Sequence, residues 1–180
     1  SACATCDGFF YRKKTVAVVG GGDTACEEAS YLSNLADKVY MIVRKDYLRA
    51  SKVMQRRVME NQKIEIFFNT NTVGLFGDAK VEGAHLVRFK GTDREETFDI
   101  AIDGFFLGIG HRPNTDIFAN QIALDEQGYI KTDGVTTATN IPGVFATGDV
   151  ADPRYRQAIT SAGMGCKAAL DAERFLVEQE

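Results

Sequence analysis

The segment Thr15-Val-Ala-Val-Val-Gly-Gly-Gly-Asp-Thr-Ala25 joins a short, continuously apolar run to three consecutive glycines. Residues 15–19 have the pattern of a strand that is buried on both faces of a parallel sheet. A helical periodicity follows at once, and Thr24 with Glu27 has the spacing of a capping box. Residues 38–43 form a second apolar run. Strand, helix and strand within about 30 residues predict a βαβ unit.

Gly20, Gly22 and Ala25 match the G-x-G-x-x-G/A fingerprint of dinucleotide-binding sites, in the strand-to-helix context that the fingerprint requires. Glycine permits the tight turn and the close approach of a pyrophosphate, and a small third residue lets the helix pack against the strand. The helix N-terminus, at Asp23 and Thr24, directs N–H groups and a positive dipole at the anion. We therefore predict that these five residues form a dinucleotide site. A plain tight turn is the alternative interpretation of the glycines.

The stretch Val43-Arg44-Lys45-Asp46-Tyr47-Leu48-Arg49 indicates which dinucleotide is preferred. NAD sites place an acidic residue about 20 residues after the glycines, where it binds the ribose 2′-hydroxyl. Here two cations precede Asp46 and one follows it, and a guanidinium suits bidentate recognition of a phosphate. Arg44, Lys45 and Arg49 are therefore predicted to bind the 2′-phosphate of NADPH. A solvated basic turn is the alternative interpretation.

The remaining pattern completes an α/β fold. Further elements are expected in chain order: a helix over residues 51–61, a strand over 64–68, alternating short strands over 71–99, strands over 103–109 and 143–147, and a long helix over 155–177. The long helix is expected to turn one apolar face inward, with Ile159, Ala162, Cys166, Ala169 and Leu170. These elements predict a Rossmann-like, three-layer (ββα) domain that contains a β-meander.

Composition argues against several classes of protein. The 180 residues carry 21 basic and 25 acidic side chains, for a net charge of −4, so a nucleic-acid binder held by phosphate contacts is not expected. No apolar run approaches the roughly 20 residues that span a bilayer, so no membrane association is expected. His85 and His111 are isolated, and the four cysteines lack the second ligand pair of a zinc site. We therefore expect no metal.

Cys3 and Cys6 are separated by two residues, and Asp7 follows directly. This spacing favours a redox-active pair in a reducing compartment, and a cytoplasmic location is expected. Disulfide exchange needs an attacking thiolate and a proton for the thiolate that leaves, and an adjacent carboxyl can transfer that proton. Two buried thiols beside a turn aspartate are the alternative. Cys26 and Cys166 are expected to be buried, because each lies on the apolar face of a predicted helix.

Five segments carry a family resemblance: Cys3-Ala-Thr-Cys-Asp-Gly-Phe-Phe10, Gly20-Gly-Gly-Asp-Thr-Ala25, Gly108-Ile-Gly-His-Arg-Pro-Asn114, Gly148-Asp149 and Arg156-Gln-Ala-Ile-Thr-Ser-Ala-Gly163. Their order resembles that of the low-molecular-weight, bacterial-type, NADPH-dependent thioredoxin reductases, over essentially the whole chain. The resemblance implies that Cys3 and Cys6 cycle between disulfide and dithiol. It also implies that Cys6 faces a flavin, that Cys3 attacks the disulfide of thioredoxin, and that Asp7 is the acid/base. A flavin is the usual mediator between a hydride donor and a disulfide.

The same resemblance implies FAD as a second cofactor, with residues 1–112 as the redox and NADPH-binding domain and 113–180 as the C-terminal part of a second Rossmann-like, FAD-binding domain. The cofactor contacts that it adds are Ile109, Gly148, Asp149, Val150, Arg156, Gln157 and Ala158. The family's N-terminal FAD segment has no counterpart here, so the chain is expected to be a fragment that is inactive alone. The full-length protein is expected to be a homodimer. Lys45 stands where the family commonly has arginine, so weaker NADPH binding is expected.

Two other functions stay open from the sequence. One is an isolated NADP-binding module without turnover, which NADPH binding without disulfide reduction would indicate. The other is the flavoprotein subunit of an alkyl hydroperoxide reductase, which also carries a C-x-x-C at this place. That subunit usually has a thioredoxin-like N-terminal region and a different dipeptide between its cysteines.

Overall fold

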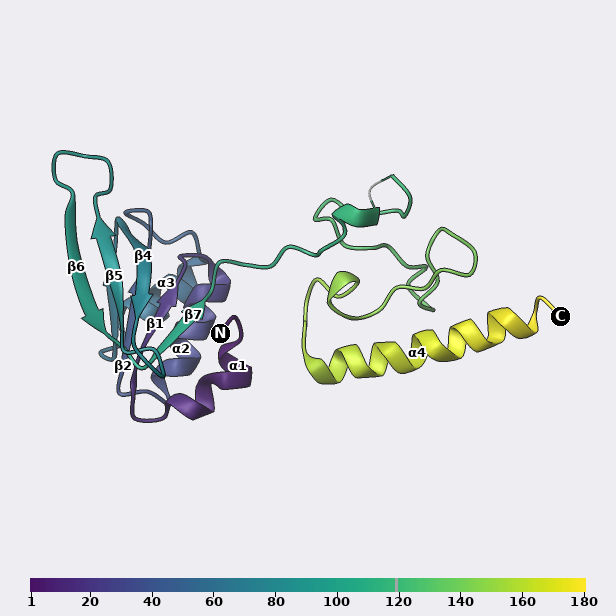
Figure 1. The fold of residues 1–180 in the computed structure, drawn as a ribbon, viewed down its shortest axis with the longest axis horizontal. Helices are drawn as coiled ribbons and strands as arrows, with labels where there is room; N and C mark the ends of the chain where they lie inside the picture. Colours follow the sequence, from purple (N-terminus) through teal and green to yellow (C-terminus); the bar gives the residue numbers. More distant parts are fainter. Residues whose placement is uncertain (119) are drawn as a thin grey trace. The chain divides into compact units, whose positions relative to one another are not determined.

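The computed structural model describes residues 1–118 and 120–180, which form two compact units, Ser1–Gly110 and His111–Glu180 (Figure 1). The first unit contains, in chain order, α1 (Ala4–Asp7), the 3-10 helix η1 (Gly8–Tyr11), β1 (Thr15–Val19), α2 (Asp23–Ser33), β2 (Lys38–Ile42), α3 (Lys52–Met59), β3 (Ile64–Phe67), β4 (Thr70–Phe76), β5 (Gly83–Arg88), β6 (Glu96–Ala101) and β7 (Gly104–Leu107). The second unit contains the 3-10 helices η2 (Asp116–Phe118) and η3 (Gly148–Val150) and the long helix α4 (Ala158–Val177).

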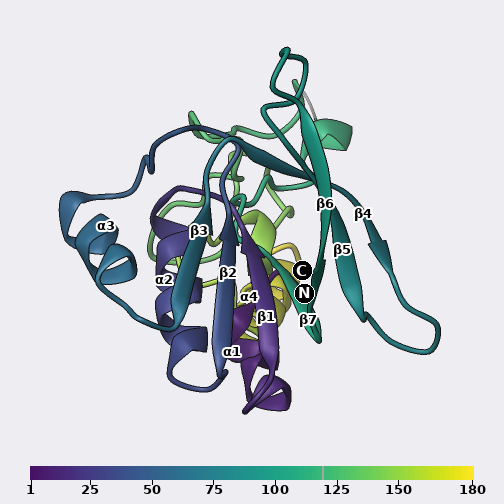
Figure 2. The same cartoon turned by 90° about the vertical axis from the view of Figure 1, so that its left-hand side faces the viewer.

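A four-stranded parallel sheet organises the first unit, with strand order β3-β2-β1-β7 (Figure 2). Strand β1 is central, and Val16 pairs with Val39 on one side and with Gly104 on the other. Val16, Ala17 and Val18 are completely buried, as the apolar run predicts for a strand that is covered on both faces.

The side chains of β1 alternate between two apolar cores, because successive residues of a strand point to opposite faces. Val16 and Val18 pack with the helices, in a core that includes Leu32 of α2. Ala17 faces the other way, into a core that includes Leu86 of β5. Helices, parallel sheet and antiparallel sheet therefore form three layers, and the predicted Rossmann-like (ββα) class is confirmed.

The third layer is an antiparallel sheet with strand order β4-β5-β6. In the sequence, these three strands come between β3 and β7 of the parallel sheet. Strand β4 begins three residues after β3 ends, and Asn69 at this corner adopts a positive φ of 54°. The β-meander expected over 71–99 is confirmed, with strands that span residues 70–101. A bulge between Thr72 and Gly74 bends β4.

The start of α2 differs from the prediction. Gly22, not Thr24, is the N-cap, and no side chain caps the helix there. The capping box of Thr24 and Glu27 is therefore wrong, because the chain is already helical at Asp23. The first N–H groups of α2 are left without a side-chain acceptor at this end, as an anion-binding helix requires.

The second unit has less regular structure than predicted. The strand expected over 143–147 is wrong, because the described part of this region forms only a single antiparallel bridge, between Phe145 and Ala138. Helix α4 begins at Ala158 rather than Tyr155, because Arg156 adopts a positive φ of 50°, which a helix cannot include. The helix then runs without interruption to Val177.

The apolar face of α4 is not buried. Ile159 is 81% exposed and Leu170 48%, and Cys166 is exposed as well. Ala162 and Ala169 are exposed too. The predicted inward orientation of these five residues is therefore wrong, because no residue of α4 is buried against the described part of the chain. Cys26, by contrast, is buried as predicted. No helix in the described ranges, 1–118 and 120–180, is long and apolar enough to cross a membrane.

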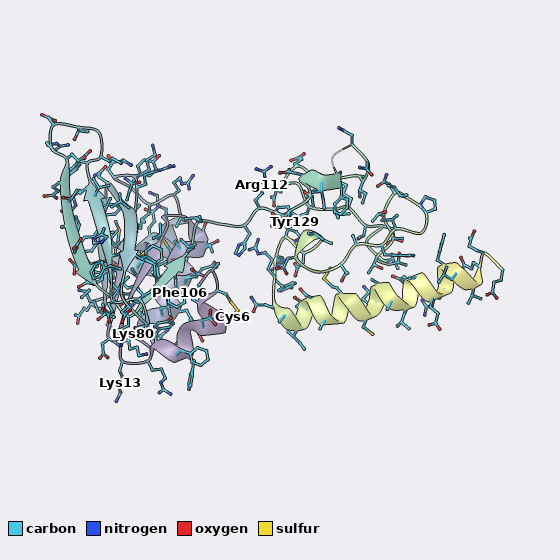
Figure 3. The ribbon with its side chains drawn as sticks, viewed as in Figure 1. Cys6, Lys13, Lys80, Phe106, Arg112 and Tyr129 are labelled. Atoms are coloured by element: carbon cyan, nitrogen blue, oxygen red, sulfur yellow. A yellow bond between two sulfur atoms is a disulfide. The ribbon has the colours of Figure 1, made fainter. Side chains whose placement is uncertain are left out.

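Truncation of Phe106 tests the helix-side core. Phe106 lies in the first unit (Figure 3), and its side chain is fully buried. Its ring meets the Tyr11 ring edge to face, at 5.3 Å between centroids. We expect Phe106→Ala to lower the free energy of unfolding by about 3–5 kcal/mol, because the cavity cannot refill. The matched variant Leu107→Ala, at a neighbouring side chain that is 39% exposed, should cost less than about 1 kcal/mol. Urea unfolding of the chain measures both, and equal losses would contradict the assignment of Phe106 to the core.

Candidate functional site

A cavity of about 780 Å³ lies at the carboxyl end of the parallel sheet. The last residues of three parallel strands line it, Val19 of β1, Ile42 of β2 and Leu107 of β7, and β4 forms the opposite wall. Ligands of open α/β sheets bind in this position, outside the carboxyl ends of the strands. The cavity is therefore the candidate nucleotide site.

The glycine turn forms the floor of the cavity and has no room for side chains at its first position. Gly20 has a φ of +137°, and a Cβ atom there would lie 2.4 Å from the carbonyl oxygen of Gly108. Ala25 is fully buried behind the turn, and a Cβ atom on Gly108 would lie 2.7 Å from the Cα atom of Ala25. The small residue at the third fingerprint position thus lets α2 pack directly on β1 and on Gly108, the residue after β7.

Gly22 is different, because a Cβ atom there would meet nothing within 4 Å. Gly22 lines the cavity as the N-cap of α2, so the space beside it is open to a ligand. The amides of Asp23, Thr24 and Ala25 form the first turn, where N–H groups have no carbonyl acceptor within the helix. This combination of an open approach and free N–H donors fits a pyrophosphate.

Not every predicted fingerprint residue contacts the cavity. Thr24 lines it, but Asp23 and Ala25 do not. The carboxylate of Asp23 instead accepts the backbone N–H of Ser51 at 2.9 Å, and so holds the N-terminus of α3 beside the first turn of α2. Arg49 donates its backbone N–H to the carbonyl of Gly21 at 2.7 Å. These two bonds attach the loop that carries the basic residues to the glycine turn.

Three basic residues line the cavity and are exposed to solvent: Arg44, Lys45 and Arg49. None has an ion-pair partner among the residues that the structure describes. Asp46, the alternative NAD-type acid, is exposed and does not line the cavity. Unpaired positive charge around a cavity of this shape suits a phosphate group in addition to the pyrophosphate.

Sequence reasoning missed the far wall of the cavity. Asn71 and Thr72 of β4 line this wall, and Tyr47 of the basic loop is a further lining residue of the cavity. The Oγ1 atom of Thr72 is buried and has no hydrogen-bond partner within the described residues. No local signal marks these strand residues, because the register that brings the bulged β4 to the sheet edge is a tertiary feature. Ile109, predicted as a cofactor contact, lines the cavity and is 69% exposed.

The predicted redox residues lie together on α1, and Cys3 and Cys6 form a disulfide (Figure 3). Cys3 is the N-cap of this one-turn helix, and its Sγ atom accepts the N–H of Cys6 at 3.1 Å. Asp7 ends the helix, partly buried, and donates its N–H to the carbonyl of Cys3 at 3.1 Å. Helix α1 packs against α2, the same helix whose first turn borders the cavity.

The predicted flavin residues lie in the second unit, where one carboxylate joins them. Asp152 is 7% exposed, and its two oxygens accept the backbone N–H groups of Arg154, Tyr155 and Arg156, each at 2.9 Å. Burial by itself would raise the pKa of Asp152, but these hydrogen bonds, together with one from Thr160, outweigh burial and hold the pKa below its usual value. Asp152 thus fixes the turn that precedes α4.

Around that turn the chain presents features that fit part of an FAD site. Gly148, in η3, has a φ of +72°, and the Oγ1 atom of Thr147 beside it is buried without a partner in the described part of the chain. Asp149 accepts a hydrogen bond from Ser161 at 3.2 Å, which connects η3 to the first turn of α4. Arg156 donates to the hydroxyl of Tyr129 at 3.2 Å.

The remaining predicted flavin residues have the same neighbourhood. Val150 ends η3, Gln157 is the N-cap of α4, and Ala158 is its first residue. The backbone N–H of Gln157 donates to Thr160 Oγ1 at 3.2 Å. An orphaned hydroxyl, a left-handed glycine and a long helix N-terminus in one segment suit a dinucleotide cofactor.

The family model for pyridine nucleotide-disulphide oxidoreductases matches residues 1–165. Since this covers most of the sequence, the chain belongs to that family. Its relatives include the mitochondrial thioredoxin reductase of Kluyveromyces lactis, which is 55% identical over all of this chain, and the thioredoxin reductase of Coxiella burnetii, 55% identical over 98% of it. The chain spans 52% and 57% of the length of these two proteins, respectively.

Solved structures agree with the sequence relatives. The thioredoxin reductase of Streptococcus pyogenes has a TM-score of 0.89 and 36% identity, and that of Giardia duodenalis has a TM-score of 0.82 and 43% identity. The two matches cover 99% and 98% of this chain, respectively, and each covers 57% of the solved chain. The predicted resemblance to thioredoxin reductases is confirmed.

The Asp152 turn leads to a pH-dependent prediction. Because its folded pKa is depressed, Asp152 stabilises the chain at pH values above its unfolded pKa of about 4, and this stability is lost as the pH falls toward the folded pKa. We expect Asp152→Asn to lower the free energy of unfolding at pH 7 by about 1–3 kcal/mol, because an amide cannot accept all four bonds. Urea unfolding at pH 7 and at steps below pH 5 should show that the difference in free energy of unfolding between wild type and variant becomes smaller as the pH falls. A difference that stays constant with pH would contradict this role.

Proposed function

We propose that this chain carries the NADPH-binding and disulfide-bearing parts of an NADPH-dependent thioredoxin reductase. The overall reaction is NADPH + H⁺ + oxidised thioredoxin → NADP⁺ + thioredoxin dithiol. The observation that carries the proposal is that a single helix, α2, borders the cation-lined cavity with its first turn and supports the Cys3–Cys6 disulfide on its side. The names of the relatives support thioredoxin as the protein substrate.

In this proposal the nucleotide half of the site binds and orients NADPH. Gly20 and Gly22 admit the pyrophosphate to the first turn of α2. Arg44, Lys45 and Arg49 neutralise the 2′-phosphate, which only NADPH carries. Specificity for NADPH over NADH then follows from electrostatics. NADH has no 2′-phosphate, so its binding lacks the charge-assisted hydrogen bonds that these three cations make to NADPH.

The dithiol half of the site exchanges electrons with thioredoxin. The Cys3 thiolate attacks the thioredoxin disulfide, a mixed disulfide forms, and Cys6 resolves it, which regenerates the Cys3–Cys6 bond and releases a thioredoxin dithiol. Asp7, which is partly buried at the end of α1, has the role of transferring protons to and from the Cys6 sulfur. The two electrons and two protons that thioredoxin gains equal those that the dithiol loses.

FAD, when bound, supplies the two-electron relay between the hydride donor and the disulfide. Residues of this chain that would hold it are Gly148, Asp149, Val150, Arg156, Gln157 and Ala158, on the turn that Asp152 organises. Division into a redox domain over 1–112 and part of an FAD domain over 113–180 belongs to the same proposal. A homodimeric full-length protein in the cytoplasm is proposed on the family resemblance and on the preference of reactive dithiols for reducing compartments.

An NADP-binding module without turnover is the second candidate for the isolated chain, favoured by a cavity that the first unit builds from its own residues. A peroxide-reductase subunit is not favoured, because the similar proteins and structures named above are thioredoxin reductases. Measurement of NADPH affinity and dithiol transfer on the same preparation separates a module from a reductase part.

Removal of one guanidinium tests the phosphate site. We expect Arg49→Ala to weaken NADPH binding roughly 10- to 100-fold, the cost of a charged hydrogen bond, and to change NADH binding little. Lys45→Arg should tighten NADPH binding, because a planar guanidinium can bind the phosphate with two bonds. Isothermal titration of the chain with each nucleotide gives both affinities.

The matched control is Arg57→Ala, which removes an exposed guanidinium of α3 that does not line the cavity. Its affinity for NADPH should equal that of the wild-type chain. Equal losses for NADPH and NADH in Arg49→Ala would show that Arg49 does not recognise the 2′-phosphate.

A single-turnover experiment tests the dithiol without any cofactor. The chain is reduced with dithiothreitol, desalted and mixed with oxidised thioredoxin, and new thioredoxin thiols are counted by alkylation and mass spectrometry. We expect the wild-type chain to deliver one electron pair, and Cys3→Ser or Cys6→Ser to abolish release of thioredoxin dithiol, because a single thiol cannot complete the exchange.

Cys166→Ser and Cys26→Ser are the controls and should transfer as the wild type does. Burial, with the negative charges of Asp23 and Glu27, raises the pKa of Cys26 to about 11, so this thiol is protonated and unreactive near neutral pH. If Cys3→Ser retained full transfer, the proposed function would be overturned.

A further inference from the structure

Glu28 of α2 meets the N-terminus of the disulfide-bearing helix. Its Oε1 atom accepts the backbone N–H of Ala4, the first residue of α1, at 3.2 Å, and Ala4 itself is 2% exposed. The second carboxylate oxygen, Oε2, is buried and has no hydrogen-bond partner among the described residues. One oxygen of this carboxylate therefore holds α1 in place, while the other is unsatisfied.

An unsatisfied buried carboxylate oxygen is costly, because it has lost its water and gained no donor. Such groups are rare in native proteins, and each needs a physical explanation. Glu27, the preceding residue of α2, is exposed to solvent and has no such conflict. The desolvation cost at Glu28 has an explanation if a hydrogen-bond donor reaches its Oε2 atom in another redox state of the site.

The Cys3 sulfur lies at the same end of α1 as the Glu28 carboxylate. The first turn of α1 has two N–H donors with acceptors from outside its own backbone: Ala4 donates to Glu28, and Cys6 donates to the Cys3 sulfur. The two acceptors thus share one helical turn. In the disulfide neither sulfur carries a hydrogen, whereas in the dithiol each is an S–H donor.

We propose that Glu28 is a positioning residue of the redox pair, whose buried oxygen accepts a hydrogen bond from the Cys3 thiol once the disulfide is reduced. The inference rests on the proposed redox cycling of Cys3 and Cys6. Reduction breaks the S–S bond with two electrons and two protons, which NADPH and solvent supply in turnover and dithiothreitol supplies in the test. One of the protons then forms the Cys3 S–H···Oε2 bond.

This bond exists only in the dithiol, so it shifts the equilibrium toward the reduced form. The side chain of Glu28→Gln has the same length and keeps an oxygen for the Ala4 N–H, but it places an NH₂ group where the acceptor was. We expect its equilibrium constant for reduction by dithiothreitol to fall about tenfold, which is about 30 mV for a two-electron couple. A purely structural role predicts no shift, because the bond to Ala4 is preserved.

The experiment equilibrates the 180-residue chain with mixtures of reduced and oxidised dithiothreitol at pH 7, without oxygen. Alkylation and mass spectrometry then give the reduced fraction of the Cys3–Cys6 pair. All proteins carry Cys166→Ser, which removes the exposed free thiol. Glu27→Gln is the matched control, because it removes an equal charge from the same helix at an exposed position.

A second measurement uses the reduced protein with Glu28 intact, and so does not depend on the folding of the variant. The S–H stretching band of Cys3, assigned by its loss in Cys3→Ser, should lie at lower wavenumber than the band of N-acetylcysteine methyl ester in carbon tetrachloride, where the thiol has no hydrogen-bond partner. An equilibrium shift confined to Glu28→Gln, together with this lowered band, supports the inference.

Equal constants for Glu28→Gln and the parent, equal shifts in both glutamine variants, or an unshifted Cys3 band would each overturn the role of Glu28. None of these results would affect dithiol transfer to thioredoxin, so the proposed function would survive them. A pair that does not exchange with dithiothreitol in any of the proteins would overturn the proposed function, and this inference with it.

Discussion

Direct contact between α2 and the central strands is the constraint on which the first unit depends. A Cβ atom at Gly20 or Gly108 would collide with backbone or with Ala25, so the helix can lie this close only because these positions carry almost no side chain. This packing brings the free N–H groups of the first turn to the carboxyl end of the sheet. The same packing gives α1 a fixed surface against which the disulfide is held.

Unsatisfied polar atoms point to chemistry in this chain. In the described residues, buried side-chain oxygens without a partner occur at Glu28, Thr72 and Thr147. These lie, respectively, against the disulfide helix, in the wall of the cation-lined cavity and beside the left-handed glycine of η3. Such atoms are destabilising in a folded chain, so their placement at the candidate sites supports the proposed nucleotide, cofactor and redox roles of these sites.

The accuracy of the sequence-based prediction followed how local each determinant is. The βαβ unit, the meander and the burial of Cys26 follow from apolar periodicity and were confirmed. The cap at Thr24 was wrong because a glycine turn competes with a side-chain cap. The burial of Cys166 and the strand over 143–147 were wrong because periodicity shows that a segment has an apolar face, but not that the described chain supplies a layer to cover it. The turn at Arg156, which precedes α4, depends on a hydrogen bond to Asp152, four residues earlier. No periodic pattern of apolar residues predicts such a turn.

By itself, the sequence determined the class of fold, the glycine turn, the basic loop and the C-x-x-C pair, since each is written in consecutive or regularly spaced residues. Tertiary structure alone decided that β4 closes the cavity, that the carboxylate of Asp23 accepts the backbone N–H of Ser51 at the start of α3, and that Glu28 reaches the first N–H of α1. Those contacts join residues that are 24 or more positions apart or lie on different sheets. The packing of helices and sheets sets such distances, and no local pattern of residues records them.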